Sequence, residues 1–262
     1  TLKSNSLETR INAYVSTGVG FERSEMPLLN STEHKYLLSE LYQKAYPNIS
    51  PSELSNTLPF LNQNKPVKKT WGFEGNVDYF RYNANTNWQK QVLGPSLNQN
   101  YYMNVSGGDE IATYVLSLGY LNQEGMVTNT DFSRFNTRFN SEIKFSKKFK
   151  VLANMSFVYS TKHLPNEGGN ISLNPILASL VKAPFTAPNI YDEEGKKSPN
   201  LEDADYWNLS NPYVLVNNRN NLVNINYRFF GSFEFIYNIN RYLNVAAQMG
   251  LNFNKEREKA FY

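Results

Sequence analysis

Long segments of this chain alternate strictly between apolar and polar residues. From Arg134 to Phe145, the even positions carry Arg, Asn, Glu and Lys, while the odd positions carry Phe, Thr, Ser and Ile. Successive side chains of a β-strand point to opposite faces of the sheet, so such a segment has one apolar and one polar face. The pattern therefore predicts a two-faced strand here.

The same alternation predicts six further strands, with Phe230 and Ile236 as apolar exceptions on a polar face. They span residues 11–19, 99–106, 113–120, 151–160, 223–238 and 243–254. Several exceed the ~5–6 residues that are usual in soluble strands. They match the ~9–11 residues that a tilted strand needs to cross a bilayer. The predicted fold is all-β: a segment of a transmembrane, antiparallel, up-and-down β-barrel.

The connections between these strands alternate in length. Residues 107–110, 146–148 and 238–241 form tight turns, whereas residues 21–98, 122–133 and 161–221 form longer links. Outer-membrane barrels have short periplasmic turns and long extracellular loops. We therefore expect 21–98 to be the first long extracellular loop and 161–221 to be the third.

The first loop also carries helix signals. Asn30 followed by Glu33 is typical of a capping box, Leu37, Leu41 and their neighbours supply an apolar face, and Pro47 ends the helix. A second short helix is predicted from about Asn85 to Leu93.

Composition narrows the class of protein. Aromatic residues make up 15% of the 262 residues and charged residues 19%, a mixture that suits strands with one lipid-facing and one wet face. A net charge of +3 is too small to indicate nucleic-acid binding. The absence of cysteine excludes disulfides, thiol nucleophiles and cysteine-ligated zinc. No apolar run approaches the ~18 residues of a transmembrane helix.

Two stretches resemble a known family. One is Asn87–Gln89 followed by Asn100–Gly108 (NYYMNVSGG), and the other is Tyr114–Gly125 (YVLSLGYLNQEG) followed by Asp131–Asn140 (DFSRFNTRFN). These runs are similar to early barrel strands of SusC/RagA-type TonB-dependent (TonB-linked) outer-membrane transporters of the Bacteroidetes. Beyond about Tyr159 the likeness is to barrel strands in general.

The resemblance implies a plugged barrel of about 22 strands that imports large nutrients, such as oligosaccharides or peptides, with energy passed through TonB. It also implies a SusD-like surface lipoprotein as partner, contact with TonB through a plug region, and contact with lipid and lipopolysaccharide. Residues 1–262 would then be the N-terminal part of the barrel, with the plug domain and the remaining strands outside them. Two alternatives stay open: a structural or docking barrel subunit without active transport, and a soluble all-β binding module.

Candidate chemistry is sparse. Residues 107–111 read GGDEI, close to a diguanylate cyclase signature, but a Gly-Gly hairpin turn explains them better because no alternating helix–strand pattern surrounds them. His34 and His163 lie in different loops and predict no metal site, and the acidic stretches 192–195 and 202–205 fit no EF-hand and are expected to be solvated. We expect no enzyme activity, no cofactor and no metal.

Two sets of residues are candidates for ligand contact. Loop aromatics can stack on sugar rings or pack against a lid protein. They are Trp71, Tyr79, Tyr82, Tyr206 and Trp207. Polar residues on the predicted lumen face can contact a plug or a substrate, but we expect them to pair with one another or with the plug. They are Arg134, Asn136, Arg138, Asn140, Glu142, Arg228 and Glu234. Near strand ends, aromatic girdles are expected at Tyr101, Tyr102, Phe132, Tyr159 and Tyr242.

Overall fold

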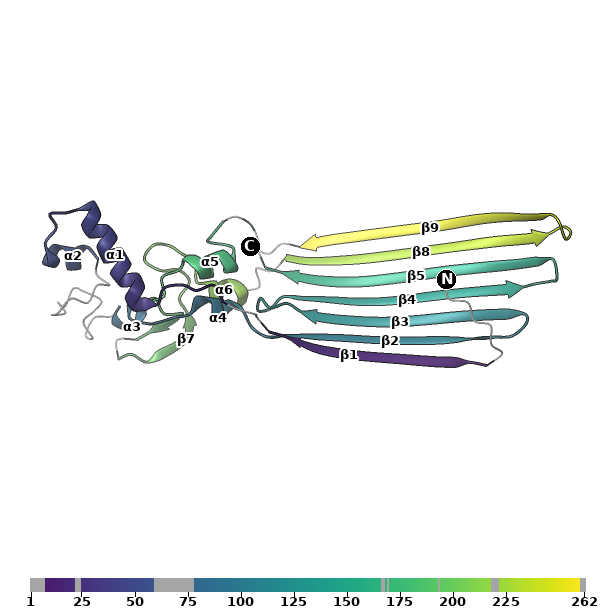
Figure 1. Cartoon of the computed structure of the whole chain (residues 1–262), viewed down its shortest axis with the longest axis horizontal. Coiled ribbons are helices and arrows are strands. Elements are labelled where there is room, and N and C mark those ends of the chain that lie inside the picture. The colour runs from purple at the N-terminus through teal and green to yellow at the C-terminus, as the bar shows by residue number, and fades with distance from the viewer. Residues whose placement is uncertain are drawn as a thin grey trace. The chain divides into compact units, whose positions relative to one another are not determined.

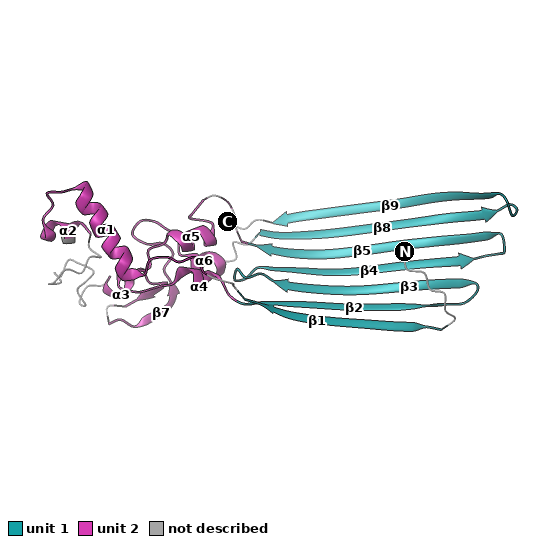
Figure 2. Ribbon diagram, in the orientation of Figure 1, with its two compact units in different colours: residues 1–21, 95–164, 222–262 teal, residues 22–94, 165–221 magenta. Residues whose placement is uncertain are grey.

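The structure is a computed structural model that describes residues 8–21, 25–58, 78–165, 168, 170–192, 194–217 and 222–259 (Figure 1). The chain divides into two compact units (Figure 2). Unit 1 comprises residues 1–21, 95–164 and 222–262, and unit 2 comprises residues 22–94 and 165–221. Each unit is thus assembled from separate stretches of the chain.

Unit 1 is a seven-stranded antiparallel sheet in which every strand pairs with its neighbour in the chain order β1-β2-β3-β4-β5-β8-β9. The strands are β1 (Arg10–Gly20), β2 (Ser96–Gly108), β3 (Ala112–Glu124), β4 (Asp131–Lys144), β5 (Phe149–Leu164), β8 (Leu222–Asn238) and β9 (Asn244–Lys259). The predicted up-and-down sheet of seven strands is confirmed. Each strand has 11–17 residues, longer than predicted, and the β3–β4 link shrinks to residues 125–130.

The pairing register separates apolar from polar residues over the whole sheet. One continuous row runs Val15, Tyr101, Tyr120, Phe135, Tyr159, Tyr227 and Lys255. The neighbouring row on the opposite face runs Tyr14, Tyr102, Gly119, Asn136, Val158, Arg228 and Asn254. Because the register has no slip between these strands, the alternation seen in each segment adds up to one apolar face and one polar face.

Aromatic residues mark two levels of the apolar face. Tyr159 pairs with Tyr227 at one level, with ring centroids 4.9 Å apart. Phe149 pairs with Tyr237 at the other, ten positions along both strands. Ten residues of strand span ~33 Å, and a tilt of ~40° reduces this to a height of ~25 Å. That height equals the apolar band of an outer-membrane barrel.

Two residues that were expected in the girdles lie on the other face. Tyr102 and Phe132 occupy polar-face positions, as their pairing with Gly119 and Lys162 shows. The Tyr102 hydroxyl donates a hydrogen bond to Ser117 Oγ at 3.3 Å. The girdle prediction for them was wrong because an aromatic residue near a strand end fits either face, and only the register decides between them.

The β2–β3 turn explains the GGDEI stretch. Gly108 has φ +147°, and a Cβ there would lie 2.2 Å from the carbonyl oxygen of Ala112. Asp109 Oδ1 accepts hydrogen bonds from the backbone N–H groups of Ile111 (2.8 Å) and Ala112 (2.7 Å). Glycine is therefore required for conformation, and the aspartate closes the hairpin.

The outer edges of the sheet are open. Within the described residues, β1 and β9 each pair on one side only. Large apolar side chains also stay exposed on the apolar face, with Ile11 66% and Leu251 64% exposed. Unpaired backbone groups in lipid cost several kcal/mol each, so this sheet needs further strands beside it to be stable in a bilayer.

Unit 2 consists of short elements. They are α1 (Ser31–Ala45), α2 (Pro51–Thr57), α3 (Tyr79–Tyr82), α4 (Trp88–Val92), α5 (Pro175–Val181), β6 (Asn189–Tyr191), β7 (Lys197–Leu201) and α6 (Pro212–Asn217). The capping box predicted for α1 is confirmed, since Glu33 N–H donates to Asn30 and Asn30 N–H donates to Glu33. No helix in the described part of the chain is long and apolar enough to cross a membrane.

The two stretches of unit 2 share one core. Leu54 and Tyr82 from the first stretch pack with Ala183 and Phe185 from the second. The backbones also join, because Ala84 N–H donates to Phe185 C=O (3.1 Å) and Ala187 N–H donates to Arg81 C=O (2.8 Å). The two predicted loops therefore form one folded body.

Candidate functional site

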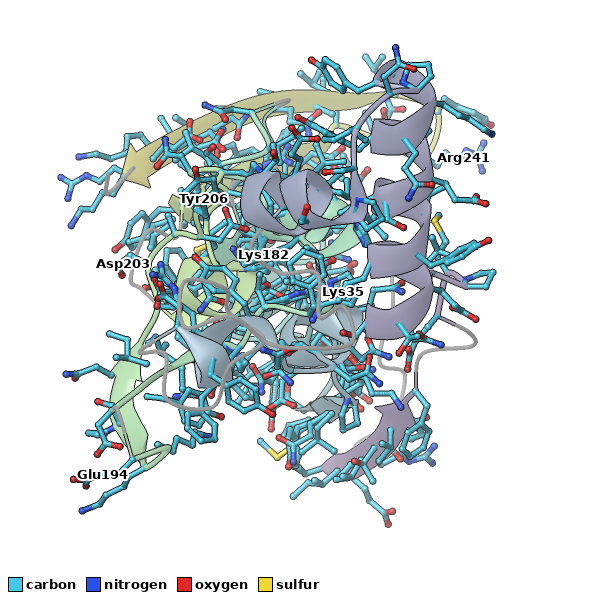
Figure 3. All side chains as sticks on the ribbon, turned by 90° about the vertical axis from the view of Figure 1, so that its left-hand side faces the viewer. Lys35, Lys182, Glu194, Asp203, Tyr206 and Arg241 are labelled. Atoms are coloured by element: carbon cyan, nitrogen blue, oxygen red, sulfur yellow. The ribbon has the colours of Figure 1, made fainter. Side chains whose placement is uncertain are left out.

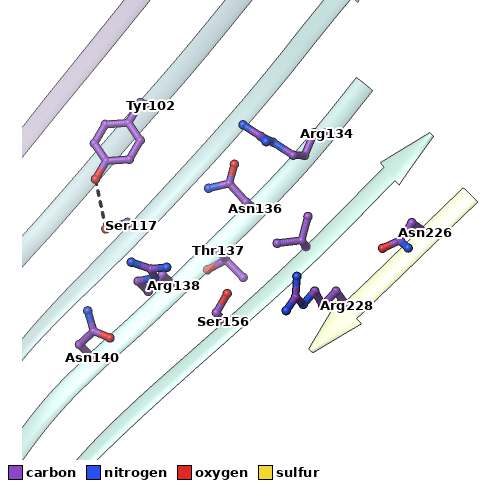
Figure 4. A pocket seen from close by; sticks show the side chains of 11 residues that line it. Tyr102, Ser117, Arg134, Asn136, Thr137, Arg138, Asn140, Ser156, Asn226 and Arg228 are labelled. Carbon is purple, nitrogen blue, oxygen red and sulfur yellow. Dashed lines mark hydrogen bonds between the residues drawn. The ribbon is translucent and has the colours of Figure 1, made fainter. Parts of the chain in front are cut away.

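The polar face of the sheet carries a hollow of about 610 Å³ (Figure 4). Five of the seven residues predicted to face the lumen line it: Arg134, Asn136, Arg138, Asn140 and Arg228. Thr137 and Val158 also line it, as do four neutral polar groups that were not predicted to face the lumen: Tyr102, Ser117, Ser156 and Asn226. Each of these four occupies a polar-face position of its own strand, so the two-residue period was the signal that could have found them.

Strand geometry spaces the three arginines of this hollow. Arg134 and Arg138 are four residues apart on β4, which is ~13 Å along the strand. Arg228 on β8 lies in the row of Asn136, two strands away, or ~10 Å across the sheet. In Figure 4, Arg138 and Arg228 flank Ser156. A second hollow of about 540 Å³ is also lined by Arg138 and Arg228, so these two guanidinium groups face both.

The three arginines of the hollow have no acidic partner in the described part of the wall. No carboxylate of the described residues lies within 4 Å of Arg134, Arg138 or Arg228. Glu142 instead pairs with Lys150 at 3.5 Å. Of the expected pairing of lumen-facing charges with one another or with the plug, the structure shows this one pair, whose two residues both lie on the polar face, and pairing with the plug stays a prediction. Arg138 lies opposite Ser117 and Ser156, and Glu142 is four residues away on β4, or ~13 Å, which exceeds the reach of an ion pair. The hollow presents three cations among neutral hydrogen-bonding groups.

Unit 2 contains an apolar hollow of about 400 Å³. Its wall consists of His34, Leu38, Leu41, Tyr42, Ala45, Leu58, Val181, Ala183, Trp207 and Leu209. Tyr206 is 69% exposed and meets Trp207 edge to face at 5.7 Å. Trp207 in turn meets Phe185 of the core at 5.8 Å. An exposed aromatic pair beside an apolar hollow can accept a sugar ring or an apolar side chain.

The other loop aromatics are not equivalent to this pair. Tyr82 is 1% exposed and belongs to the core, so it is not available to a ligand. Burial raises the pKa of its hydroxyl to about 12. Tyr79 packs edge to face against Phe80 at 5.1 Å, and Phe80 stacks on Tyr191. Trp71 lies outside the described residues.

A buried ion pair holds the segment that carries Tyr206 and Trp207. Lys182 Nζ donates to Asp205 Oδ2 (3.0 Å) and to the Leu209 carbonyl (2.7 Å), and both charged side chains are 1% exposed. Asp205 Oδ1 accepts the backbone N–H groups of Trp207 and Leu209, each at 3.0 Å. Burial lowers the pKa of Lys182, and the Asp205 carboxylate opposes that shift. This network fixes the turn that presents the aromatic pair.

Two of the three acids in the stretch 202–205 are therefore not solvated as predicted. Asp205 is buried, and Glu202 pairs with Arg81. Burial raises the pKa of Glu202, against the opposing effect of Arg81 and Lys182. The prediction failed because both cations come from segments that the sequence does not place next to this stretch.

The two histidines have structural contacts. His34 meets Phe185 edge to face at 5.7 Å, and His163 Nδ1 lies 2.8 Å from Asp131 Oδ1 at the end of the β4–β5 pair. In the part of the chain that the structure describes, no group of three His, Cys, Asp or Glu side chains could hold a metal ion.

The sequence of this chain is similar to sequences of TonB-dependent receptors. No protein-family model matches the chain. It is 25% identical over 226 residues to TonB-dependent receptor P26 and 28% identical over 171 residues to TonB-dependent receptor P3, both of Formosa agariphila. It is 24% identical over 135 residues to TonB-dependent receptor SusC of Bacteroides thetaiotaomicron. These matches cover 86%, 64% and 49% of the chain, but only 20%, 16% and 14% of the relatives.

Solved structures of a peptide importer share the fold. The RagAB peptide importer in the closed-closed state superimposes with a TM-score of 0.72 at 20% identity, over 98% of this chain and 29% of that chain. The open-open state gives a TM-score of 0.71 at 19% identity, with the same coverage.

These findings confirm three predictions. They are the likeness to SusC/RagA-type TonB-dependent transporters, the barrel-segment fold and the outer-membrane location. The similarity to proteins named as a TonB-dependent receptor and a peptide importer implies a non-enzymatic role.

Proposed function

We propose that this chain forms part of the wall of an outer-membrane transporter that imports large nutrients, such as oligosaccharides or peptides. One observation carries the proposal: a continuous seven-stranded sheet has a lipid-compatible face ~25 Å high between two aromatic levels and a polar face behind it. The sequence likeness to TonB-dependent receptors supports the same role. The wall itself carries out no bond chemistry.

Unit 2 serves as the extracellular capture body in this proposal. The chain enters it after β1 and after β5, at the sheet end opposite the tight turns. Tyr206 and Trp207, held by the Lys182–Asp205 pair, contact the incoming ligand beside the apolar hollow. A SusD-like surface lipoprotein covers the barrel, and TonB acts through a plug region. Because the similar RagAB structures are of a peptide importer, peptides are one substrate class to test.

The arginines of the polar face line the transport path. Guanidinium groups without an acidic partner in the wall attract carboxylate, sulfate or phosphate groups. We infer that Arg138 and Arg228 are the main contacts, because both line the two hollows. Their counter-charge comes from the substrate or from the plug.

The test is uptake by cells that produce the complete protein, with its own gene deleted from the chromosome. Growth is followed on oligosaccharides or peptides as sole carbon source, with and without a protonophore. The proposal predicts energy-dependent growth that falls at least tenfold in rate at limiting substrate when Tyr206 and Trp207 are both changed to Ala. Tyr191→Ala, on the β6–β7 hairpin, is the matched loop control.

Undiminished growth of the deletion strain on every substrate would overturn the transport proposal. The chain would then act as a structural or docking barrel subunit.

A further inference from the structure

The end of β9 carries five alternating charges. Residues 255–259 read Lys-Glu-Arg-Glu-Lys, and the strand continues through Lys259. The two-residue period of a strand sends Lys255, Arg257 and Lys259 to one face and both glutamates to the other. The cations and the acids of this segment are therefore sorted onto opposite sides of the sheet.

The pairing register shows which face receives the cations. Lys255 lies opposite Tyr227, Arg257 opposite Ile225 and Lys259 opposite Val223, all on the apolar face. Glu256 and Glu258 lie on the polar face, opposite Asn226 and Asn224. Asn224 Nδ2 donates to Glu256 Oε1 at 2.5 Å. The acids thus have polar neighbours, whereas the cations stand among apolar ones.

The level of these cations on the face is defined by the aromatic row. Lys255 continues the row Tyr101, Tyr120, Phe135, Tyr159 and Tyr227. Arg257 and Lys259 follow at ~7 Å and ~13 Å further along the strand, toward the end opposite the tight turns. Aromatic rings of a barrel girdle lie at the membrane–water interface. Side chains immediately beyond them lie in the headgroup region.

These three cations have no acidic partner in the described residues, and all three are exposed. The acid nearest to this level on the same face is Asp131, in the row of Lys259, and His163 at 2.8 Å already pairs with it. A row of cations ~7 Å apart at headgroup level is complementary to phosphate groups, which accept charge-assisted hydrogen bonds from Arg and Lys.

We propose that Lys255, Arg257 and Lys259 form a phosphate-binding ladder for lipid headgroups of the outer leaflet. The inference rests on the proposed function for the direction in which the sheet crosses the membrane. Phosphorylated lipid is favoured over an acidic protein partner because the ladder begins in the aromatic row and lies on the face that contacts lipid. The ladder anchors this end of β9 to the leaflet.

The experiment uses the complete protein, purified in a neutral detergent and delipidated. Native mass spectrometry measures its binding of lipid A that carries two phosphates, compared with lipid A that carries one. The triple variant K255Q/R257Q/K259Q is compared with the wild type and with E256Q/E258Q. This control alters the same strand at the same level, but on the opposite face.

Surface cations near anionic lipid each contribute roughly fivefold in affinity, so the triple variant should bind diphosphorylated lipid A about a hundredfold more weakly. The acid variant should bind it as the wild type does, and one lipid phosphate fewer should weaken wild-type binding. Equal losses in both variants, or none in the triple variant, would overturn the ladder. Loss of an acidic protein partner from the triple variant, with lipid binding intact, would also overturn it.

Membrane fractionation separates this result from the proposed function. If the triple variant binds lipid normally in a protein that fractionates with the outer membrane, the ladder fails and the transporter proposal stands. If the wild type is not in the outer membrane, both fail. Where the triple variant does not assemble, R257Q alone provides the test, with an expected loss of about fivefold, and K255R/K259R should retain wild-type binding.

Discussion

The buried Lys182–Asp205 pair gives the sharpest prediction about unit 2. Asp205→Asn keeps an oxygen that can accept the N–H groups of Trp207 and Leu209, but it leaves the Lys182 ammonium buried without a counter-charge. Figure 3 shows Lys182 amid other side chains, whereas Asp203 lies at the edge of the view. The substitution therefore removes the charge and the oxygen that accepts from Lys182, and it keeps the hydrogen bonds to the backbone of the turn.

The magnitude follows from the burial of the pair. Removing one partner of a buried ion pair costs about 3–5 kcal/mol. Since 1.4 kcal/mol is a factor of ten, hydrogen-exchange protection should fall by about 10² to 10³·⁵, up to the full stability of the unit. The charge-free double variant K182M/D205L should recover part of this protection, because it leaves no unpaired charge.

Hydrogen–deuterium exchange of the complete protein in detergent, read by mass spectrometry, measures this directly. Peptides within 175–217 should exchange faster in D205N, while peptides of β3 and β4 should not change. Asp203→Asn is the matched control, because its side chain is exposed two positions away. Unchanged exchange in D205N, or equal acceleration in D203N, would refute the assigned role of the pair.

Two further predictions concern Gly108 and Lys35. Gly108→Ala should destabilise the barrel by about 1–3 kcal/mol, because φ is +147° and a Cβ would lie 2.2 Å from a carbonyl oxygen. Gly18→Ala, which meets nothing within 4 Å, should leave the thermal unfolding temperature unchanged, and equal shifts would contradict the argument. Burial lowers the pKa of Lys35 from 10.5 to about 8, so the cost of burying its charge is present below pH 8 and is relieved as pH rises from 8 to 10.5. Unit 2 should gain stability in that window, and the ¹³Cε resonance of Lys35 should titrate near 8; a midpoint near 10.5 would contradict this.

The sheet was predictable because its signal is local. A strand that lies between lipid and a wet interior must alternate along its own sequence, so each strand could be found without knowing its neighbours. Strand ends were less predictable, and the link expected at 122–133 shrank to 125–130 because pairing between β3 and β4 continues to Glu124 and Asp131.

Unit 2 was predictable only where a helix has a local start signal. The box at Asn30 and Glu33 found α1, and the same pattern at Ser50 and Glu53, with Pro51 between them, starts α2 and could have been found. Burial of Tyr82 could not have been predicted from the sequence, because its partners Ala183 and Phe185 lie a hundred residues later in the chain. The aromatic pair Tyr206 and Trp207 was selected by residue type alone, and it stays a prediction.

The lumen-facing residues were selected by period, and their common face follows from the register. The two-residue alternation alone does not show which charges on different strands lie close enough to pair. Glu234 lies six residues from Arg228 on the same strand, whereas Glu142 lies on β4, two strands away, so the separation of Arg228 from Glu142 emerges only with the pairing.

The central claim is that the sheet separates lipid from a wet interior, and a single-cysteine scan of β8 tests it most directly. Residues 1–262 contain no cysteine, and any cysteine elsewhere in the complete protein is first replaced by Ser, so each variant carries one spin label. In the complete protein reconstituted in lipid, labels at 225, 227, 229 and 233 should be accessible to oxygen and protected from a water-soluble nickel reagent. Labels at 226, 228 and 232 should show the reverse preference. The predicted result is that accessibility alternates every second residue, with oxygen reaching the odd positions and nickel the even ones. Equal nickel accessibility at odd and even positions would contradict the account.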